Sequence, residues 1–175
     1  MTSRAGASVH ASAVKVGNRA VLIRGPSGVG KSRLAFELIL AGRSGQIPHA
    51  VLVGDDRVLL QVYEGQLVVR PARELAGLIE IRGLGIRRCD FAEEAVVGMV
   101  VDLSAPDAER LPPPEALLTA AYGVLIPRIP VGPGMHPLPL VVAALTTTEG
   151  VVCPRSSADC LKGIGNHMSR TIATE

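Results

Sequence analysis

The chain has 175 residues, a length that predicts one domain with one dominant functional site. Apolar residues make up 47% of it, but there is no Trp and only two Tyr and two Phe, so aliphatic side chains must fill the core of a layered α/β fold. The formal charge is +2 and the basic residues are dispersed, which argues against a nucleic-acid partner because such binding needs a basic stripe or aromatic platforms.

The sequence shows no signal for export or membrane insertion. The first ten residues lack an apolar core, and the apolar stretch Leu138–Leu145 is far shorter than the roughly 18 residues of a membrane span. We therefore expect a cytoplasmic protein without a membrane partner. Its three cysteines suit reduced thiols better than disulfides, although a zinc site of Cys153, Cys160 and His167 is conceivable despite its unusual spacing.

The N-terminal part is predicted to run from strand through a glycine turn to helix. Residues 11–24 read as a hairpin that turns at Gly17 and Asn18 and ends in a short buried strand. Residues 31–42 are predicted to form a helix, with Gly42 as its C-terminal stop.

The remaining chain is predicted to be mostly strands. Residues 49–62 contain a strand that ends on the two carboxylates Asp55 and Asp56, and a second hairpin turns at Glu64 and Gly65. Apolar and polar residues alternate over 77–86, and 95–104 read as a strand covered on both faces. The prolines at 112–114 predict a loop, and the many prolines and glycines of 126–139 predict a loop or an edge. We therefore expect a domain over 1–148 and a tail over 149–175 that is a candidate for partial disorder.

The glycine turn fits the phosphate-binding pattern G-x-x-x-x-G-K-[ST] at every fixed position. Glycines let backbone N–H groups surround phosphate oxygens, the lysine neutralises the phosphates, and the serine hydroxyl can bind Mg²⁺. A chance glycine turn between strand and helix is the alternative. The predicted phosphate ligands are Gly25, Pro26, Ser27, Gly28, Val29, Gly30, Lys31 and Ser32.

Two further pairs of charged residues are candidates for the site. Asp55 and Asp56 follow a strand, and adjacent side chains there point to opposite faces, so one can reach Mg²⁺ and the other an incoming hydroxyl. A solvated acidic turn would have the same sequence. Glu80 and Arg82 share one face of a strand, which taken alone is more typical of an exposed ion pair.

Together, His10 in "VHASAVKVG", the loop "GPSGVGKS", the doublet "LVGDDRV" and the motif "GLIEIRGLGI" resemble the catalytic domain of the HPr kinase/phosphorylase family. The likeness extends from about residue 10 to residue 145. It implies a bacterial P-loop kinase domain, a central β-sheet flanked by helices, that transfers phosphate from Mg-ATP to a serine of the phosphocarrier protein HPr or a close relative. Many members also run the reverse phosphorolysis, and the family's domain assembles into hexamers.

The resemblance also implies a role for each candidate residue. Asp55 would be the general base toward the target serine, and Asp56 would be the carboxylate on the metal side. His10 would tune Asp55, although one histidine at a strand start can equally have no role. Mg²⁺ would be placed by Glu80 beside Ser32, and the phosphates would be neutralised by Lys31 and Arg82.

Two departures from the family pattern stand out. Familiar members carry a further N-terminal domain, whereas this chain begins nine residues before His10, as expected of a minimal, catalytic-domain-only form. Met135 occupies the place of an arginine in the loop after the last core strand, a change expected to weaken phosphorolysis in particular. His136 and Arg128 are nearby candidates to compensate.

Three other functions are compatible with the phosphate loop. The chain could be a P-loop kinase of another protein or of a small molecule, since the sequence names no acceptor. It could be a non-catalytic ATP-binding regulatory module, but the set of site residues is complete. A GTPase switch is the weakest reading, because no base-reading motif follows.

Overall fold

The computed structural model describes residues 6–148 and residue 150, and within them the chain forms the expected α/β fold. Two α-helices occur in this part, α1 (Lys31–Arg43) and α2 (Pro137–Thr146), with the short 3₁₀ turns η1 (Arg73–Leu75) and η2 (Pro114–Leu117). The strands are β1 (Ala7–Val9), β2 (Ser12–Val16), β3 (Arg19–Arg24), β4 (Ala50–Gly54), β5 (Val58–Tyr63), β6 (Gln66–Pro71), β7 (Leu78–Ile81), β8 (Gly85–Arg88), β9 (Ala95–Leu103), β10 (Leu118–Ala121) and β11 (Val124–Val131).

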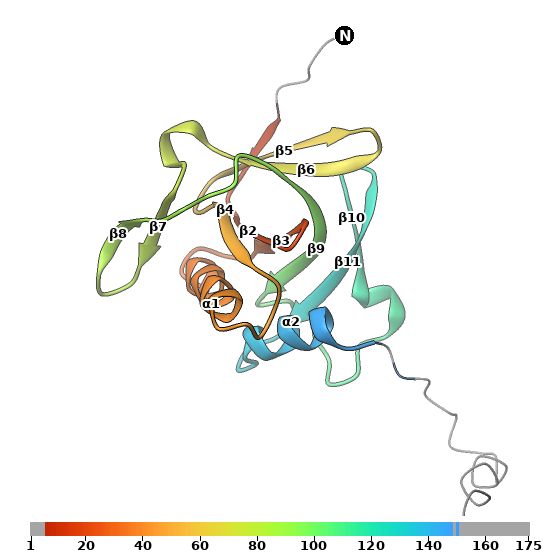
Figure 1. Cartoon of the computed structure of the whole chain (residues 1–175). Coiled ribbons are helices and arrows are strands. Elements are labelled where there is room, and N and C mark those ends of the chain that lie inside the picture. The colour runs from red at the N-terminus through yellow and green to blue at the C-terminus, as the bar shows by residue number, and fades with distance from the viewer. Residues whose placement is uncertain (1–5, 149, 151–175) are drawn as a thin grey trace, which may run out of the picture.

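Nine strands form one mixed sheet, and β7 and β8 form a separate two-stranded sheet (Figure 1). The main path of the large sheet runs β1-β5-β6-β9-β3-β2-β4, and β10 joins it through β11. The strand β9 is its centre, because it pairs in parallel with β3 and β11 and antiparallel with β6. This position explains the near-continuous apolar sequence of residues 95–103, which is buried from both sides.

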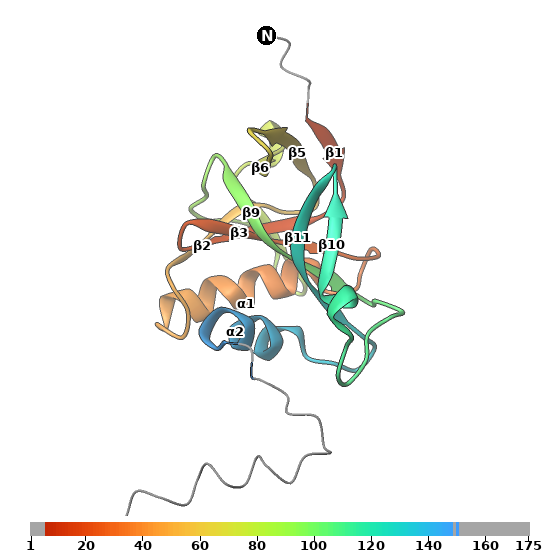
Figure 2. The same ribbon diagram turned by 90° about the vertical axis from the view of Figure 1, so that its right-hand side faces the viewer.

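Alternation along the strands divides the core between the two faces of the sheet. In β3, Val21 and Ile23 face the cluster that contains the buried side of α1, whereas Ala20 and Leu22 face the other cluster. Both helices lie on the first side, as Figure 2 shows. The second cluster is closed by strands instead, with buried residues of β5, β6, β10 and β11, so the sheet bends over itself.

The two predicted hairpins are confirmed. Strands β2 and β3 pair antiparallel across Gly17 and Asn18, and β5 and β6 pair across Glu64 and Gly65, both of which have positive φ. The predicted helix is also present.

One prediction about glycine was wrong, and one about prolines is decided in favour of an edge strand. Gly42 lies inside α1 rather than beyond its end: a Cβ there would lie 2.6 Å from the backbone N of Ala50, so the glycine permits close packing of α1 on β4. Residues 126–131 form a strand rather than a loop, and each has a paired neighbour on one side only, as in an edge strand: β11 pairs with β10 through residue 127 and with β9 from residue 128 onward. The change of partner within one strand accommodates Pro127 and Pro130.

Neither helix of the described residues has the length and apolar character that a bilayer span requires. The predicted tail, apart from residue 150, and the conceivable zinc ligands Cys153, Cys160 and His167 lie outside the described residues.

Candidate active site

The glycine-rich loop joins β3 to α1, as its sequence predicts. Gly25, Gly28 and Gly30 have φ values of 143°, 78° and 105°, which side chains with a Cβ rarely adopt. At Gly25 a Cβ would also lie 2.8 Å from the carbonyl oxygen of Leu103 in β9. No side chain caps the start of α1, so its first N–H groups are directed at the loop, where they suit an anion.

The side chain of Lys31 folds back onto the first two residues of the phosphate loop. Its ammonium donates hydrogen bonds to the carbonyl oxygens of Gly25 at 3.0 Å and Pro26 at 2.9 Å, and the residue is only 6% exposed. Burial lowers the pKa of Lys31 below its usual value, while the charges of Asp56 and Asp55 partly oppose that effect. A buried ammonium beside two carboxylates is therefore available to a phosphate that takes the place of the carbonyl groups.

Asp55 follows β4 and points into the protein. The residue is 3% exposed; its Oδ1 accepts a hydrogen bond from the Ser12 hydroxyl at 2.6 Å, and its Oδ2 accepts one from the backbone N–H of Glu80 at 3.1 Å. These bonds fix the carboxylate between β2 and β7. Sequence reasoning missed Ser12, whose only signal is a polar residue at the start of an apolar strand, two positions after His10.

Asp56 points the other way, as expected for adjacent residues at a strand end. It adopts a left-handed conformation with φ 63°, and its side chain is 64% exposed. Nδ1 of His10 lies 3.3 Å from its Oδ1, an ion pair when the imidazole is protonated. The contact that the structure gives His10 is thus to Asp56, whereas the sequence analysis placed this histidine beside Asp55.

A cavity of about 680 Å³ gathers most of the predicted residues. This volume lies in the range of small-molecule sites. Asp55, Gly25 and Pro26 do not line it, whereas the phosphate loop from Ser27 onward does. Its lining comprises residues 27–33, Phe36 and Glu37 of α1, and His10, Asp56, Glu80, Ile81 and Arg82.

The cavity carries ligand types that suit Mg²⁺. Ser32, Asp56 and Glu80 line it together and offer one hydroxyl and two carboxylates. Among the described residues no three His, Cys, Asp or Glu side chains form a complete metal cage. Mg²⁺ at nucleotide sites is usually held by one or two carboxylates, phosphate oxygens and water, so this sparse set fits the ion.

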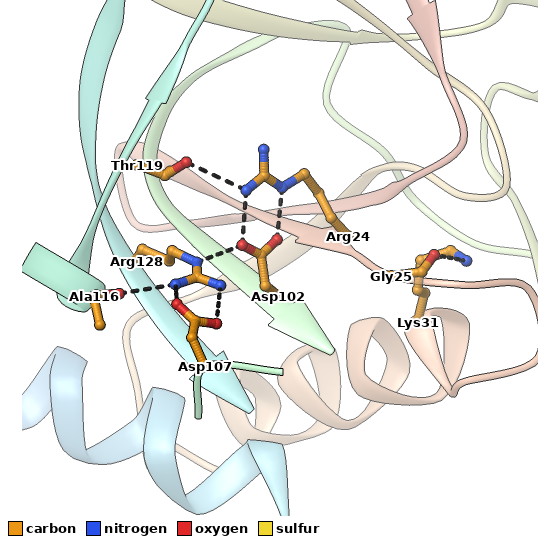
Figure 3. A network of polar contacts seen from close by, with 8 residues as sticks. All are labelled: Arg24, Gly25, Lys31, Asp102, Asp107, Ala116, Thr119 and Arg128. Atoms are coloured by element: carbon orange, nitrogen blue, oxygen red, sulfur yellow. Dashed lines mark hydrogen bonds and ion pairs between the residues drawn. The ribbon is translucent and has the colours of Figure 1, made fainter. Parts of the chain in front are cut away.

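An ion-pair network joins β3, β9 and β11 next to the start of the phosphate loop (Figure 3). Asp102, near the end of β9, accepts two hydrogen bonds from Arg24 at 2.7 and 2.8 Å and one from Arg128 at 2.5 Å. Burial alone would raise the pKa of Asp102, but the bonds from the two arginines outweigh it and hold that pKa below the usual value. Arg128 also binds Asp107 through two nitrogens. Sequence analysis missed this network, whose members are 78 and 26 positions apart.

The loop between β11 and α2 contains Met135, which is partly exposed. Its sulfur accepts a hydrogen bond from the N–H of Gly132 at 3.3 Å. Arg128 cannot replace a missing loop charge there, because its guanidinium is committed to Asp102, Asp107 and the carbonyl of Ala116. His136 precedes the first residue of α2.

Comparison with known proteins agrees with this geometry. Residues 3–149 match the family model described as the HPr serine kinase C-terminal domain. The HPr kinase/phosphorylase of Clostridium beijerinckii is 41% identical over 78 residues, and that of Streptococcus thermophilus is 46% identical over 82 residues. Each alignment covers 45% of this chain but only 24% of the relative, so the chain matches about a quarter of these curated proteins.

A solved structure extends the match over most of the chain. The Hpr(Ser) kinase/phosphatase from Coxiella burnetii superposes with a TM-score of 0.63 and 27% sequence identity. The match covers 79% of this chain and 93% of that one.

Proposed function

This chain belongs to the HPr serine kinase C-terminal domain family, and we propose that it is an ATP-dependent kinase of a serine in HPr or a closely related phosphocarrier protein. The single observation that carries the proposal is the cavity in which the phosphate loop meets His10, Asp56, Glu80 and Arg82. Phosphoryl transfer needs positioning and charge neutralisation above all, and these residues provide both at the start of α1.

The phosphates of ATP bind the N–H groups of the loop and the start of α1. Lys31 exchanges the carbonyl oxygens of Gly25 and Pro26 for phosphate oxygens, which restores full hydrogen bonding to its ammonium. Arg82 lies at the cavity's edge near the loop, since one of its nitrogens is 4.0 Å from a Cβ built on Gly28. It is placed to neutralise charge on the phosphoryl group that is being transferred.

The metal site of this proposal uses Ser32, Asp56 and Glu80, which share the cavity. When bound, Mg²⁺ neutralises phosphate oxygens and orients them for in-line transfer. The backbone N–H of Glu80 donates a hydrogen bond to Asp55, so the contact that orients the buried Asp55 carboxylate also fixes the backbone position of Glu80.

The general base is one of the two adjacent carboxylates. The family resemblance assigns proton removal from the acceptor serine to Asp55 and the metal side to Asp56. In the structure Asp56 has the direct access to the cavity, whereas Asp55 would have to leave Ser12 and Glu80 to reach a substrate. Substitution of the base by asparagine should lower kcat about 10²- to 10⁴-fold without loss of nucleotide affinity. Comparing Asp55→Asn with Asp56→Asn therefore assigns the roles.

Phosphorolysis of the phosphoserine product is a second reaction of the same site. Met135 offers no charge for inorganic phosphate in the loop after β11, and Arg128 is held elsewhere. We expect weak phosphorolysis that a Met135→Arg substitution strengthens. By the same resemblance we expect a cytoplasmic homo-oligomer, hexameric as in the family.

The decisive experiment incubates the protein with Mg-ATP and the HPr-like carrier of the same cell, and maps any added phosphate by intact-mass and peptide mass spectrometry. One phosphoserine that disappears with Lys31→Ala establishes the kinase. ATP binding without phosphate on the carrier would instead favour a kinase of another substrate or a non-catalytic regulatory module.

A further inference from the structure

The β7–β8 hairpin stands apart from the large sheet (Figure 1). Its residues 80–82 line the cavity. All seven residues from 82 to 88 are exposed. We define the hairpin surface as Arg82, Leu84, Ile86, Arg87 and Arg88. It is one of the places where the chain shows large apolar side chains to solvent, with Leu84 64% and Ile86 69% exposed.

The base of the hairpin is fixed, so its tip is presented at a defined position. Ile79 is buried in the core beside α1, and the N–H of Glu80 is bonded to Asp55. The N–H of Cys89 donates to the carbonyl of Gly77 at 2.9 Å. An anchored hairpin loses little conformational entropy when a partner binds its tip.

The hairpin surface is continuous with the active-site cavity. Glu80, Ile81 and Arg82 belong to the hairpin and also line the cavity. In the antiparallel register Glu80 stands opposite Ile86, so both side chains lie on one face of the hairpin. A molecule that covers Ile86 therefore lies next to the phosphate loop.

Every charged residue of the hairpin surface as defined is an arginine. Arg82, Arg87 and Arg88 give it three positive charges, and within residues 6–148 none of them has a carboxylate at ion-pair distance. Five other arginines of the same part of the chain are paired with acids. Because side chains alternate along the strand, Arg88 lies on the face of Ile86 and Arg87 on the opposite face. Unpaired arginines therefore border the apolar side chains on both sides of the hairpin, which fits an apolar protein surface bordered by Asp or Glu.

We propose that the hairpin surface docks the acceptor protein, with Leu84 and Ile86 against an apolar patch and the arginines against carboxylates around it. The inference rests on the proposed function, and it names the surface that brings the acceptor hydroxyl to the cavity. Apart from Arg82, the residues of this surface are not needed for ATP binding, because Leu84, Ile86, Arg87 and Arg88 do not line the cavity.

The test is a separation of acceptor recognition from nucleotide use in the full chain. Leu84→Ser/Ile86→Ser should raise KM for the carrier about tenfold or more, since central interface side chains often contribute more than 1 kcal/mol each. KM for ATP and kcat at saturating carrier should stay within about twofold. Leu125→Ser is the matched control, because this side chain is 66% exposed on β11, outside the hairpin, and should change neither KM.

The arginines supply a second readout. Arg87→Glu/Arg88→Glu should weaken carrier binding most at low salt, because screening reduces the charge contribution of the wild type at higher ionic strength. Binding is measured by calorimetry with the Lys31→Ala variant as a non-turnover background, so it does not depend on catalysis.

Four outcomes would overturn the inference. An unchanged KM for the carrier in both hairpin variants would show that the surface does not dock the acceptor. A rise in KM for ATP as large as the rise in KM for the carrier would show that its role is structural. Dissociation of an oligomer by the apolar variant, followed by light scattering, would assign the surface to a second copy of this chain. A wild type that neither binds nor phosphorylates the carrier overturns both proposals. One that binds the carrier without phosphorylating it refutes the kinase alone, and calorimetry with the arginine variant then still tests docking.

Discussion

The hydrogen bond from Ser12 to Asp55 gives the sharpest prediction for stability. Ser12 is fully buried, and its hydroxyl is the only side-chain donor to the Asp55 carboxylate among the described residues. The substitution Ser12→Ala removes the donor without adding volume and leaves one carboxylate oxygen unpaired at 3% exposure. Hydrogen bonds to charged groups contribute about 1.5–3 kcal/mol, so the free energy of unfolding should fall by about that amount.

The measurement is urea unfolding at pH 7 followed by far-ultraviolet circular dichroism. We expect an unchanged m value with a lower midpoint, and a melting temperature lower by roughly 3–12 °C for a domain of this size. Ser8→Ala is the control, because Ser8 is exposed in β1 and such surface changes are usually within about 0.5 kcal/mol.

A double-mutant cycle separates this bond from other effects of Asp55. The losses caused by Ser12→Ala and Asp55→Asn should not add, since both disrupt the same bond. A Ser12→Ala protein within about 0.5 kcal/mol of the wild type, or fully additive losses in the double variant, would refute the reasoning.

Three further predictions follow from close contacts and charge. Gly25→Ala should weaken Mg-ATP binding about tenfold or more in calorimetry, because its φ of 143° and the carbonyl of Leu103 at 2.8 Å exclude a Cβ; retained affinity would contradict this. Gly42→Ala, usually stabilising in a helix, should instead destabilise the domain by about 1–3 kcal/mol in urea unfolding, because the added Cβ meets Ala50; a gain in stability would be the contrary result. Asp102→Asn should cost about 3 kcal/mol at pH 7. Because the folded-state pKa of Asp102 is depressed, this difference should be complete above about pH 4 and shrink as the pH falls further, and a difference that stays constant down to pH 2 would contradict it.

Local patterns in the sequence predicted the local parts of this fold. The phosphate loop, both hairpin turns and the opposite directions of Asp55 and Asp56 depend on residues within a few positions of one another, and the structure has all of them. The strand β9 was also predicted, because a strand at the centre of a sheet needs apolar residues on both faces.

What the sequence did not reveal depends on distant partners. The buried hydroxyl of Ser12 is explained by its hydrogen bond to Asp55, 43 positions away. The carboxylate of Asp102 is likewise explained by its bonds to arginines on two other strands. For residues 126–131 the prolines left loop and edge strand open, and only the pairing with β10 and β9 decides for a strand. Gly42 was misread because helix ends and close helix packing both select glycine.

The central position of β9 has a consequence for the order of folding during synthesis. Its partners β3 and β6 precede it in the chain and β11 follows it, so the sheet cannot be joined until residues 95–103 have left the ribosome. Before that point β2–β4 and the β5–β6 hairpin are separate pieces with open edges, and the phosphate loop lacks the strand against which Gly25 packs. Pairings of this range make folding slow and expose edges to aggregation. Nascent chains stopped before β9 should therefore need a chaperone and should not bind nucleotide. Chains released after β11 should fold without a chaperone and bind nucleotide.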